Sequence, residues 1–242
     1  MSIAEKLTEI AENVQKVFDA GKKAENKEFW DEYQDRGNRQ NYNHAFTGLG
    51  WSEKNLKPCY DIKPQNAVLM FRDFPLAINI QDYFESVGVD LDFSKCVHFT
   101  EMCLNSAITA FNVIDTTSAP TSIAYIFSSA KNLKSVGLLR IRNEGSQAFN
   151  SAFNNANSLE DITIEGVIGK DVDFKSCVKL SKASITSIIN ALSTTTSGPS
   201  ITFSKTAVNK VFETSEGVNN GSTSTEWANL IATKSNWTIS LA

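Results

Sequence analysis

Few side chains of this sequence have the type and spacing that catalysis requires. The chain has only two histidines, His44 and His98, and His98 stands between the apolar residues Cys96 and Phe99, where a solvated side chain is expected. The sequence contains no GxSxG or HExxH motif and no glycine-rich phosphate loop followed by Lys and Ser or Thr. We therefore predict a protein that is not an enzyme and that has no catalytic residue, metal site or cofactor.

The acidic pairs Glu160/Asp161 and Asp171/Asp173 are the other candidates for chemistry. Two carboxylates that face each other across a cleft can act as general acid and base. Neighbouring carboxylates on the face of a repeat protein are commonly only solvated, and we favour that interpretation here.

One pattern of apolar residues is written three times between residues 93 and 183 and then begins a fourth time. Four positions recur 26 residues later in the next copy: Ile123, Phe127, Leu133 and Val136 become Phe149, Phe153, Leu159 and Ile162. An earlier copy, offset by 24 or 25 residues, has Phe99, Cys103, Ile108 and Phe111. A period in the twenties is typical of leucine-rich repeats, whose units bury their apolar faces only against neighbouring units.

Each unit is predicted to join a turn of helix to a short strand. Apolar residues three apart, with the small Ala130 or Ala156 between them, favour a helical turn that packs on the next unit. Val136 and Leu138 then alternate with a period of two, which predicts a strand with one buried face.

These strands are expected to present a polar surface to solvent. If Val136 and Leu138 point inward, Lys134, Ser135 and Gly137 point outward, and the neighbouring copies follow the same rule. The candidate ligand-binding residues are the outward side chains of three copies: Thr109, Asn112, Lys134, Ser135, Glu160, Asp161 and Thr163. Stacking places them in adjacent rows, and repeat proteins generally bind through such extended faces.

The four cysteines form no CxxC pair. Cys96, Cys103 and Cys177 stand at repeat positions that are apolar in the other copies. Buried thiols are the favoured interpretation, and disulfides or metal ligands are the alternative.

Residues 1–32 are predicted to form an oligomerisation helix. Its apolar residues follow the 4-3 spacing of a coiled-coil seam, and the oligomerisation residues are Ile3, Leu7, Ile10, Val14 and Val17. β-branched residues at the d positions are associated with more than two strands, so we expect a homo-oligomer, specifically a trimer. The alternative is that this helix packs on its own domain.

Three further parts follow the helix. Residues 33–88 are interpreted as an aromatic and glycine-rich connector with short strands, one or two of them within 60–71. Residues 89–180 are the leucine-rich repeats. Residues 181–242 are an α/β cap that closes the last unit, as terminal repeats require. The fold class is therefore an α+β repeat, a short leucine-rich-repeat solenoid with an N-terminal coiled-coil helix and an α/β C-terminal cap.

The aromatic stretch of the connector allows two interpretations. Tyr42, Phe46 and Trp51 could form a platform that stacks on sugar rings. They could equally be a compact plug that joins the helix to the repeats, and we favour the plug.

Composition narrows the class of partner. The chain has 242 residues, 41% of them hydrophobic, and a formal charge of −4 without a basic run, which argues against nucleic-acid binding. No window is long and apolar enough for membrane insertion. Glu5, Lys6 and Glu9 occupy the place where a signal peptide needs an apolar core, so export by that route is not expected.

The repeat phrases carry a resemblance to a known class of repeat. Leu91–Cys96, Phe153–Ile164 and Glu165–Gly169 resemble the BspA-like leucine-rich repeats of bacterial surface antigens. Cys103 departs from that pattern, because the other copies have phenylalanine at this position.

The two ends of the chain carry a second resemblance. Ser187–Leu192 and Ile231–Thr238 are similar to the ends of proteins encoded in tail and structural modules of phages and prophages of gut bacteria. Ile3–Asn13 and Phe29–Gly37 resemble the same group.

These resemblances imply a non-enzymatic virion protein of the tail tip or fibre, assembled in the host cytoplasm. Its partners would be other virion tail proteins and a glycan or protein of the host surface, bound through the repeats. A bacterial surface adhesin, a secreted interaction protein and a purely structural virion component are the alternatives.

Overall fold

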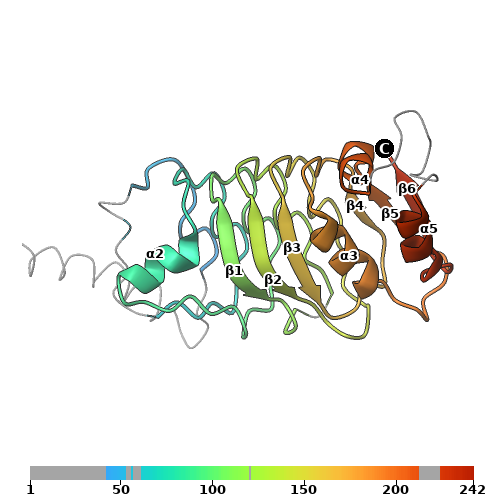
Figure 1. Cartoon of the computed structure of the whole chain (residues 1–242). Coiled ribbons are helices and arrows are strands. Elements are labelled where there is room, and N and C mark those ends of the chain that lie inside the picture. The colour runs from blue at the N-terminus through green and yellow to red at the C-terminus, as the bar shows by residue number, and fades with distance from the viewer. Residues whose placement is uncertain (1–41, 53–55, 57–60, 120, 213–223) are drawn as a thin grey trace, which may run out of the picture.

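The computed structural model describes residues 42–242 except 53–55, 57–60, 120 and 213–223. Figure 1 shows the described segments stacked side by side in chain order along one axis. The elements are α2 (Ile80–Ser86), β1 (Ala110–Asp115), β2 (Ser135–Arg140), β3 (Asp161–Glu165), β4 (Val172–Phe174), α3 (Lys182–Ala191), β5 (Ser200–Phe203), α4 (Lys205–Val211), α5 (Thr225–Ala232) and β6 (Thr238–Leu241). The predicted helix of residues 1–32, with its oligomerisation residues, lies outside the described residues.

Each of these helices begins at a polar side chain that accepts hydrogen bonds from the first turn. Asn79 caps α2, Ser181 caps α3, Ser204 caps α4 and Ser224 caps α5. Such caps satisfy amides that have no partner inside the helix. The C-terminal helices therefore begin where the sequence supplies a serine before an apolar helical pattern.

A ladder of backbone hydrogen bonds joins successive segments of the stack. The amide of Phe127 donates to the carbonyl of Ala152 at 2.9 Å, and the amide of Cys103 donates to that of Ile126 at 2.9 Å. Cys103 thus occupies the same place as Phe127. The ladder continues toward the N-terminus, where the amide of Phe71 donates to Met102 and that of Phe46 to Met70. The stacked segments therefore begin before residue 89, which was predicted to be the start of the repeats.

The segments of this ladder are series of turns, so the predicted helical turn is wrong. Residues with left-handed backbone recur at two places in the stacked segments: Leu69, Glu101, Tyr125 and Ser151 at the first, and Asp73, Asn105, Ser129 and Asn155 at the second, with φ between 51° and 57°. A right-handed helix excludes this conformation. The carbonyls and amides of the turns point along the stack instead, which is why they pair with the next segment.

The described part of the predicted connector strands shows the same turns. Within residues 61–71 the structure has isolated bridges at Ile62 and Asn66 and no strand. The prediction of one or two strands across 60–71 is therefore wrong for these residues, because their backbone turns too often to extend.

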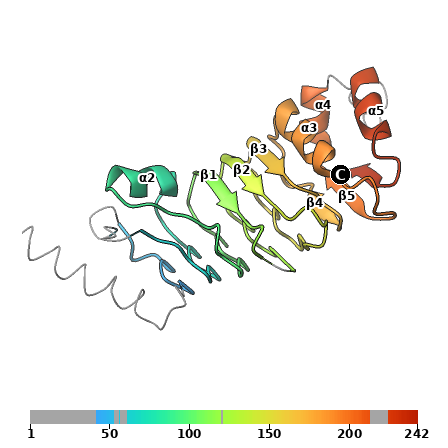
Figure 2. The same cartoon turned by 90° about the horizontal axis from the view of Figure 1, so that it is seen from below.

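Two three-stranded parallel sheets follow from the stacking. One has the order β1-β2-β3 and the other β4-β5-β6. Phe111 pairs with Val136, and Val136 pairs with Ile162, so the buried residues of the three strands stand in one row. Figure 2 shows β1, β2 and β3 in one layer, with α2 at one end and α3 at the other.

Aromatic rings form a continuous spine through the core. Neighbouring ring centroids lie 4.4–6.4 Å apart along the series Phe46, Phe71, Phe111, Phe127, Phe153, Phe174, Phe203 and Trp227. Phe111 bridges the gap that Cys103 leaves, because it contacts both Phe71 and Phe127. Each segment therefore buries its rings against the segments before and after it.

Residues near the C-terminus hydrogen-bond to the end of α3 and the residues that follow it. The ammonium of Lys234 donates to the carbonyls of Asn190 and Leu192, and the indole nitrogen of Trp237 donates to the carbonyl of Ser193 at 2.9 Å. Lys234 and Trp237 are both buried, as is Trp227. A cation at a helix C-terminus offsets the partial negative charge of the unpaired carbonyls.

Candidate functional site

The candidate residues at the start of the strands lie in one row. The carbonyl of Thr109 accepts a bond of 2.7 Å from the amide of Lys134, and the carbonyl of Lys134 accepts one of 2.8 Å from the amide of Glu160. Ser135 and Asp161 are register partners beside this row. Five of the seven predicted residues therefore come together where the strands begin.

The other two predicted residues lie farther along the strands. Asn112 in β1 and Thr163 in β3 are both exposed. The carboxamide of Asn112 accepts a bond of 2.7 Å from Asn79 and donates one of 2.6 Å to Asp82, so its side chain is held against α2. The exposed face of β1, β2 and β3, together with the row at the strand starts, forms the strand face.

Aliphatic side chains interrupt the strand face, which was predicted to be wholly polar. The pair Val113 and Leu138 lies on it, and Val113 is 38% exposed. The prediction that Leu138 points inward is wrong, because Leu139 is the buried residue. The strand face is therefore polar at its margins and aliphatic near its middle.

A backbone irregularity in β2 causes this change of register. Val136 pairs with Ile162 and Leu139 pairs with Ile164, so β2 has three steps where β3 has two. A Cβ atom on Gly137 would lie 2.7 Å from the carbonyl oxygen of Asn112, closer than real Cβ contacts allow. β1 takes the same three steps, from Phe111 to Ile114, without a glycine, so Gly137 accounts for the close approach of β1 and β2 and not for the extra residue.

A row of three charged residues, which the sequence analysis did not predict, lies at the other end of the strand face. Arg140 in β2 lies between two carboxylates, with 3.3 Å from its Nε to Glu165 and 4.0 Å from its Nη1 to Asp115. The three residues are register partners at the ends of β1, β2 and β3. Their spacing of 25 residues, close to the repeat period, is the sequence feature that could have identified them.

A glutamine closes the β1 edge of the sheet. The side-chain oxygen of Gln81 in α2 accepts from the amides of Asn112 and Val113 at 2.6 and 2.9 Å. Its nitrogen donates to the carbonyl of Val113 at 2.8 Å. One carboxamide therefore supplies the donor and acceptor that another strand would supply.

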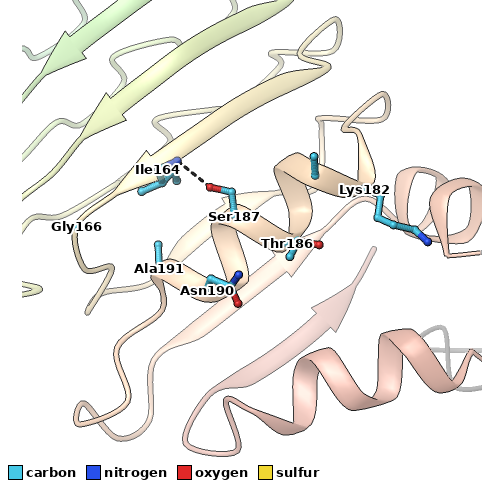
Figure 3. Close-up of a pocket in the computed structure, with 8 residues that line it drawn as sticks. Ile164, Gly166, Lys182, Thr186, Ser187, Asn190 and Ala191 are labelled. Atoms are coloured by element: carbon cyan, nitrogen blue, oxygen red, sulfur yellow. Dashed lines mark hydrogen bonds between the residues drawn. The ribbon is translucent and has the colours of Figure 1, made fainter.

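Two serines close the β3 edge. The hydroxyl of Ser184 accepts from the amide of Ile162, and that of Ser187 accepts from the amide of Ile164, both at 2.9 Å. Figure 3 shows Ser187 pointing from α3 toward Ile164. The sheet is thus bounded on both sides by side chains, and its outward face stays open.

Each border of the strand face is hollowed. A groove of about 870 Å³ lies between the end of β3 and α3, lined by Ile164, Gly166, Lys182, Ala183, Thr186, Ser187, Asn190 and Ala191. A smaller hollow of about 470 Å³ lies between α2 and β1, lined by Asp61, Gln81, Glu85, Gly88, Val89, Asp90, Leu91 and Asn112. A ligand that covers the strand face can therefore also contact both helices.

The aromatic stretch presents less surface than its composition suggested. Tyr42 and Phe46 are fully buried. Trp51 is half-buried and packs on Phe46, with ring centroids 5.3 Å apart. These packed rings favour the plug over a sugar-binding platform.

The three described cysteines are buried, free thiols. Burial raises the pKa of Cys96 to about 12, although hydrogen bonds to the backbone of His98 and Ala67 oppose the shift. Burial also raises the pKa of Cys103 and Cys177. Thiols with such pKa values stay protonated at neutral pH, so they are poor nucleophiles and metal ligands.

Three of the four carboxylates of the acidic pairs have structural partners. Asp171 accepts from the amide of Ser200 at 2.7 Å, and Asp173 lies 3.0 Å from the ammonium of Lys175. Glu160 lies 3.9 Å from Lys179. Among the described residues no group of three or more His, Cys, Asp or Glu side chains is arranged to hold a metal ion.

No helix within the described ranges is long and apolar enough to cross a bilayer.

Comparison of the chain with protein-family models, curated proteins and solved structures found no match.

Proposed function

We propose that the stacked segments are leucine-rich repeats and that the strand face is a recognition surface for a polar ligand on a cell surface. The observation that carries this proposal is the strand face itself, which three successive segments build together and which both flanking helices leave open. Extended faces of this kind are how repeat proteins bind.

The chemistry of the strand face indicates the class of ligand. Hydroxyl, carboxylate and ammonium groups surround a small aliphatic centre at Val113 and Leu138. Lys134 and Asp161 are both exposed, so the margins of the strand face offer hydrogen-bond donors and acceptors and charges of both signs. A glycan or a polar protein surface suits this composition, and we expect modest affinity for a single copy.

We further propose that the protein belongs to a phage or prophage tail, as a non-enzymatic tail-tip or fibre component that contacts the host. This part rests on the resemblance of both ends of the chain to proteins of tail modules. Oligomerisation through residues 1–32 would present several strand faces together and so strengthen binding by multivalency.

A screen of the purified protein on arrays of glycans and host surface proteins tests the recognition role. A variant with Lys134→Glu, Glu160→Lys and Thr163→Arg should lose the binding that the parent protein shows. Trp51→Ala should keep it. A charge-matched control carries Lys131→Glu, Glu144→Lys and Asn150→Arg, which are exposed residues outside the three strands.

Circular dichroism of every variant would show whether the fold is retained. Loss of binding in Trp51→Ala, with binding retained in the strand-face variant, would move the site off the strands and contradict the proposal. The tail assignment has a separate test, because antibody labelling of virions should place the protein at the tail tip or fibre.

A further inference from the structure

The outer edge of β6 has no hydrogen-bonding partner among the described residues. β6 is the last strand of its sheet and pairs with β5 alone. The amides of Thr238 and Ala242 donate toward β5 at 3.0 Å. Because backbone groups of successive strand residues point to opposite sides, Ile239 and Leu241 direct their amides and carbonyls away from β5. In the described part of the chain nothing bonds to these four groups.

The other sheet is treated differently by the same chain. Gln81 closes the edge of β1, and Ser184 and Ser187 close the edge of β3. Proteins generally cover or blunt strand edges, because free amides and carbonyls pair readily with another chain. The edge of β6 therefore differs from both edges of the β1-β2-β3 sheet, because the described residues leave it available for pairing.

The side chains of β6 have an apolar face and a polar face. Ile239 and Leu241 are register partners of the buried Ile201 and Phe203, but they are only half-buried themselves. Ser240 lies on the opposite face, where its hydroxyl is 3.0 Å from that of Thr202. A strand added at this edge would extend the apolar row if it carried apolar residues two apart.

We propose that a second copy of this chain occupies the edge, with the two β6 strands paired antiparallel about a two-fold axis normal to the sheet. β6 itself carries apolar residues two apart, and such an axis keeps the apolar faces of both copies on the same side. Ile239 then faces Leu241 of the partner subunit, and each such pair exchanges two hydrogen bonds. Ser240 faces Ser240 of the partner subunit at the centre. This contact does not depend on the proposed function or on residues 1–32.

The central position gives a specific test by disulfide trapping. Opposite residues at a non-hydrogen-bonded antiparallel position have Cα atoms about 4.5 Å apart, within the range for a disulfide. Ser240→Cys should therefore form a covalent dimer under mild oxidation. Thr238→Cys is the matched control, because the two-fold axis would hold its two copies roughly 13 Å apart. The parent protein, oxidised in parallel, accounts for the native cysteines.

A second variant removes a hydrogen-bond donor from the same edge. Leu241→Pro deletes an amide that points away from β5, and proline is tolerated at strand edges. Light scattering should show a mass lower by a factor of two than that of the parent, whereas Leu241→Val should retain the parent's mass. If Ser240→Cys cross-links no faster than Thr238→Cys, the proposal is overturned. If Leu241→Pro misfolds by circular dichroism, the disulfide test alone decides.

Discussion

Ser187 in α3 accepts a hydrogen bond of 2.9 Å from the amide of Ile164 in β3, so a helix supplies the partner that another strand would supply. Ser184, one helical turn earlier, does the same for Ile162. At the opposite edge Gln81 performs this role for β1 with a single carboxamide. The strand face therefore ends at three strands where α3 takes the place of a further strand and its side chains pair with β3.

The first prediction concerns Ser184 and Ser187, the two serines that pair with β3. Ser184 is buried and its loss leaves the amide of Ile162 without a partner, so Ser184→Ala should destabilise the protein by about 1–3 kcal/mol. Thr186→Ala, on the same helix, should change stability by less than about 0.5 kcal/mol. Denaturant unfolding measures both, and hydrogen exchange at Ile162 should be faster in the first variant alone. Equal exchange in the two variants would contradict the role of Ser184.

The second prediction concerns Gly137. Its added Cβ would meet backbone rather than a flexible side chain, so Gly137→Ala should cost about 1–3 kcal/mol. Gly50→Ala is the control, because a Cβ there meets nothing within 4 Å. Unfolding midpoints in urea would compare the two. A neutral Gly137→Ala would mean that β1 and β2 separate easily at this point.

The sequence predicted which residues are buried more reliably than how the backbone bends. The repeated Phe127 and Phe153 are buried, because burial of one face leaves a periodic trace in residue type. The turn conformation of Ser129 and Asn155 leaves a weaker trace, since asparagine and serine also occur in many other turns. A helical turn was therefore predicted where left-handed residues occur.

The candidate site was predictable only in part, for a related reason. The polar rows at the strand starts follow from alternation along a strand. The register irregularity between β2 and β3 shifts the inward residue from Leu138 to Leu139, and strict alternation along a strand does not predict it. The edge cap of Gln81 depends on contacts across more than 30 positions, which no local period records.

The third prediction concerns the aromatic spine. Phe153 is fully buried between Phe127 and Phe174, with ring centroids 5.7 and 4.4 Å away, so Phe153→Ala should cost about 3–5 kcal/mol. Asn155 is exposed but has a φ of 57°, so Asn155→Ala should cost about 1–2 kcal/mol through backbone strain. Asn155→Gly, which relieves that strain, should cost less than Asn155→Ala in the same unfolding experiment. Similar losses for Phe153→Ala and Asn155→Ala would show that the spine contributes little.

The fourth prediction concerns assembly through residues 1–32, which lie outside the described residues. The 4-3 spacing of apolar residues predicts a trimeric seam that includes Leu7 and Val14. Light scattering should give a smaller assembly for a chain that begins at Phe29 than for the full chain. Leu7→Asp with Val14→Asp should have the same effect, whereas Glu9→Lys, outside the 4-3 pattern of apolar residues, should not. Equal masses for the full and shortened chains would contradict the seam.

The last prediction concerns Lys234, whose ammonium is buried at the C-terminus of α3. Lys234→Met should cost about 1–3 kcal/mol at neutral pH, because the carbonyls of Asn190 and Leu192 lose a donor. Burial lowers the pKa of Lys234 below its ordinary value of 10.5, so the unfolded chain binds the proton more tightly than the folded one. The contribution of this group to stability therefore rises with pH between its folded and unfolded pKa values. The difference in unfolding free energy between the parent and Lys234→Met should thus widen from neutral pH to about pH 10.

Lys210→Met, at an exposed position of α4, should show no such widening. A difference that stays constant or narrows with pH would mean that the Lys234 ammonium is not desolvated in the folded protein.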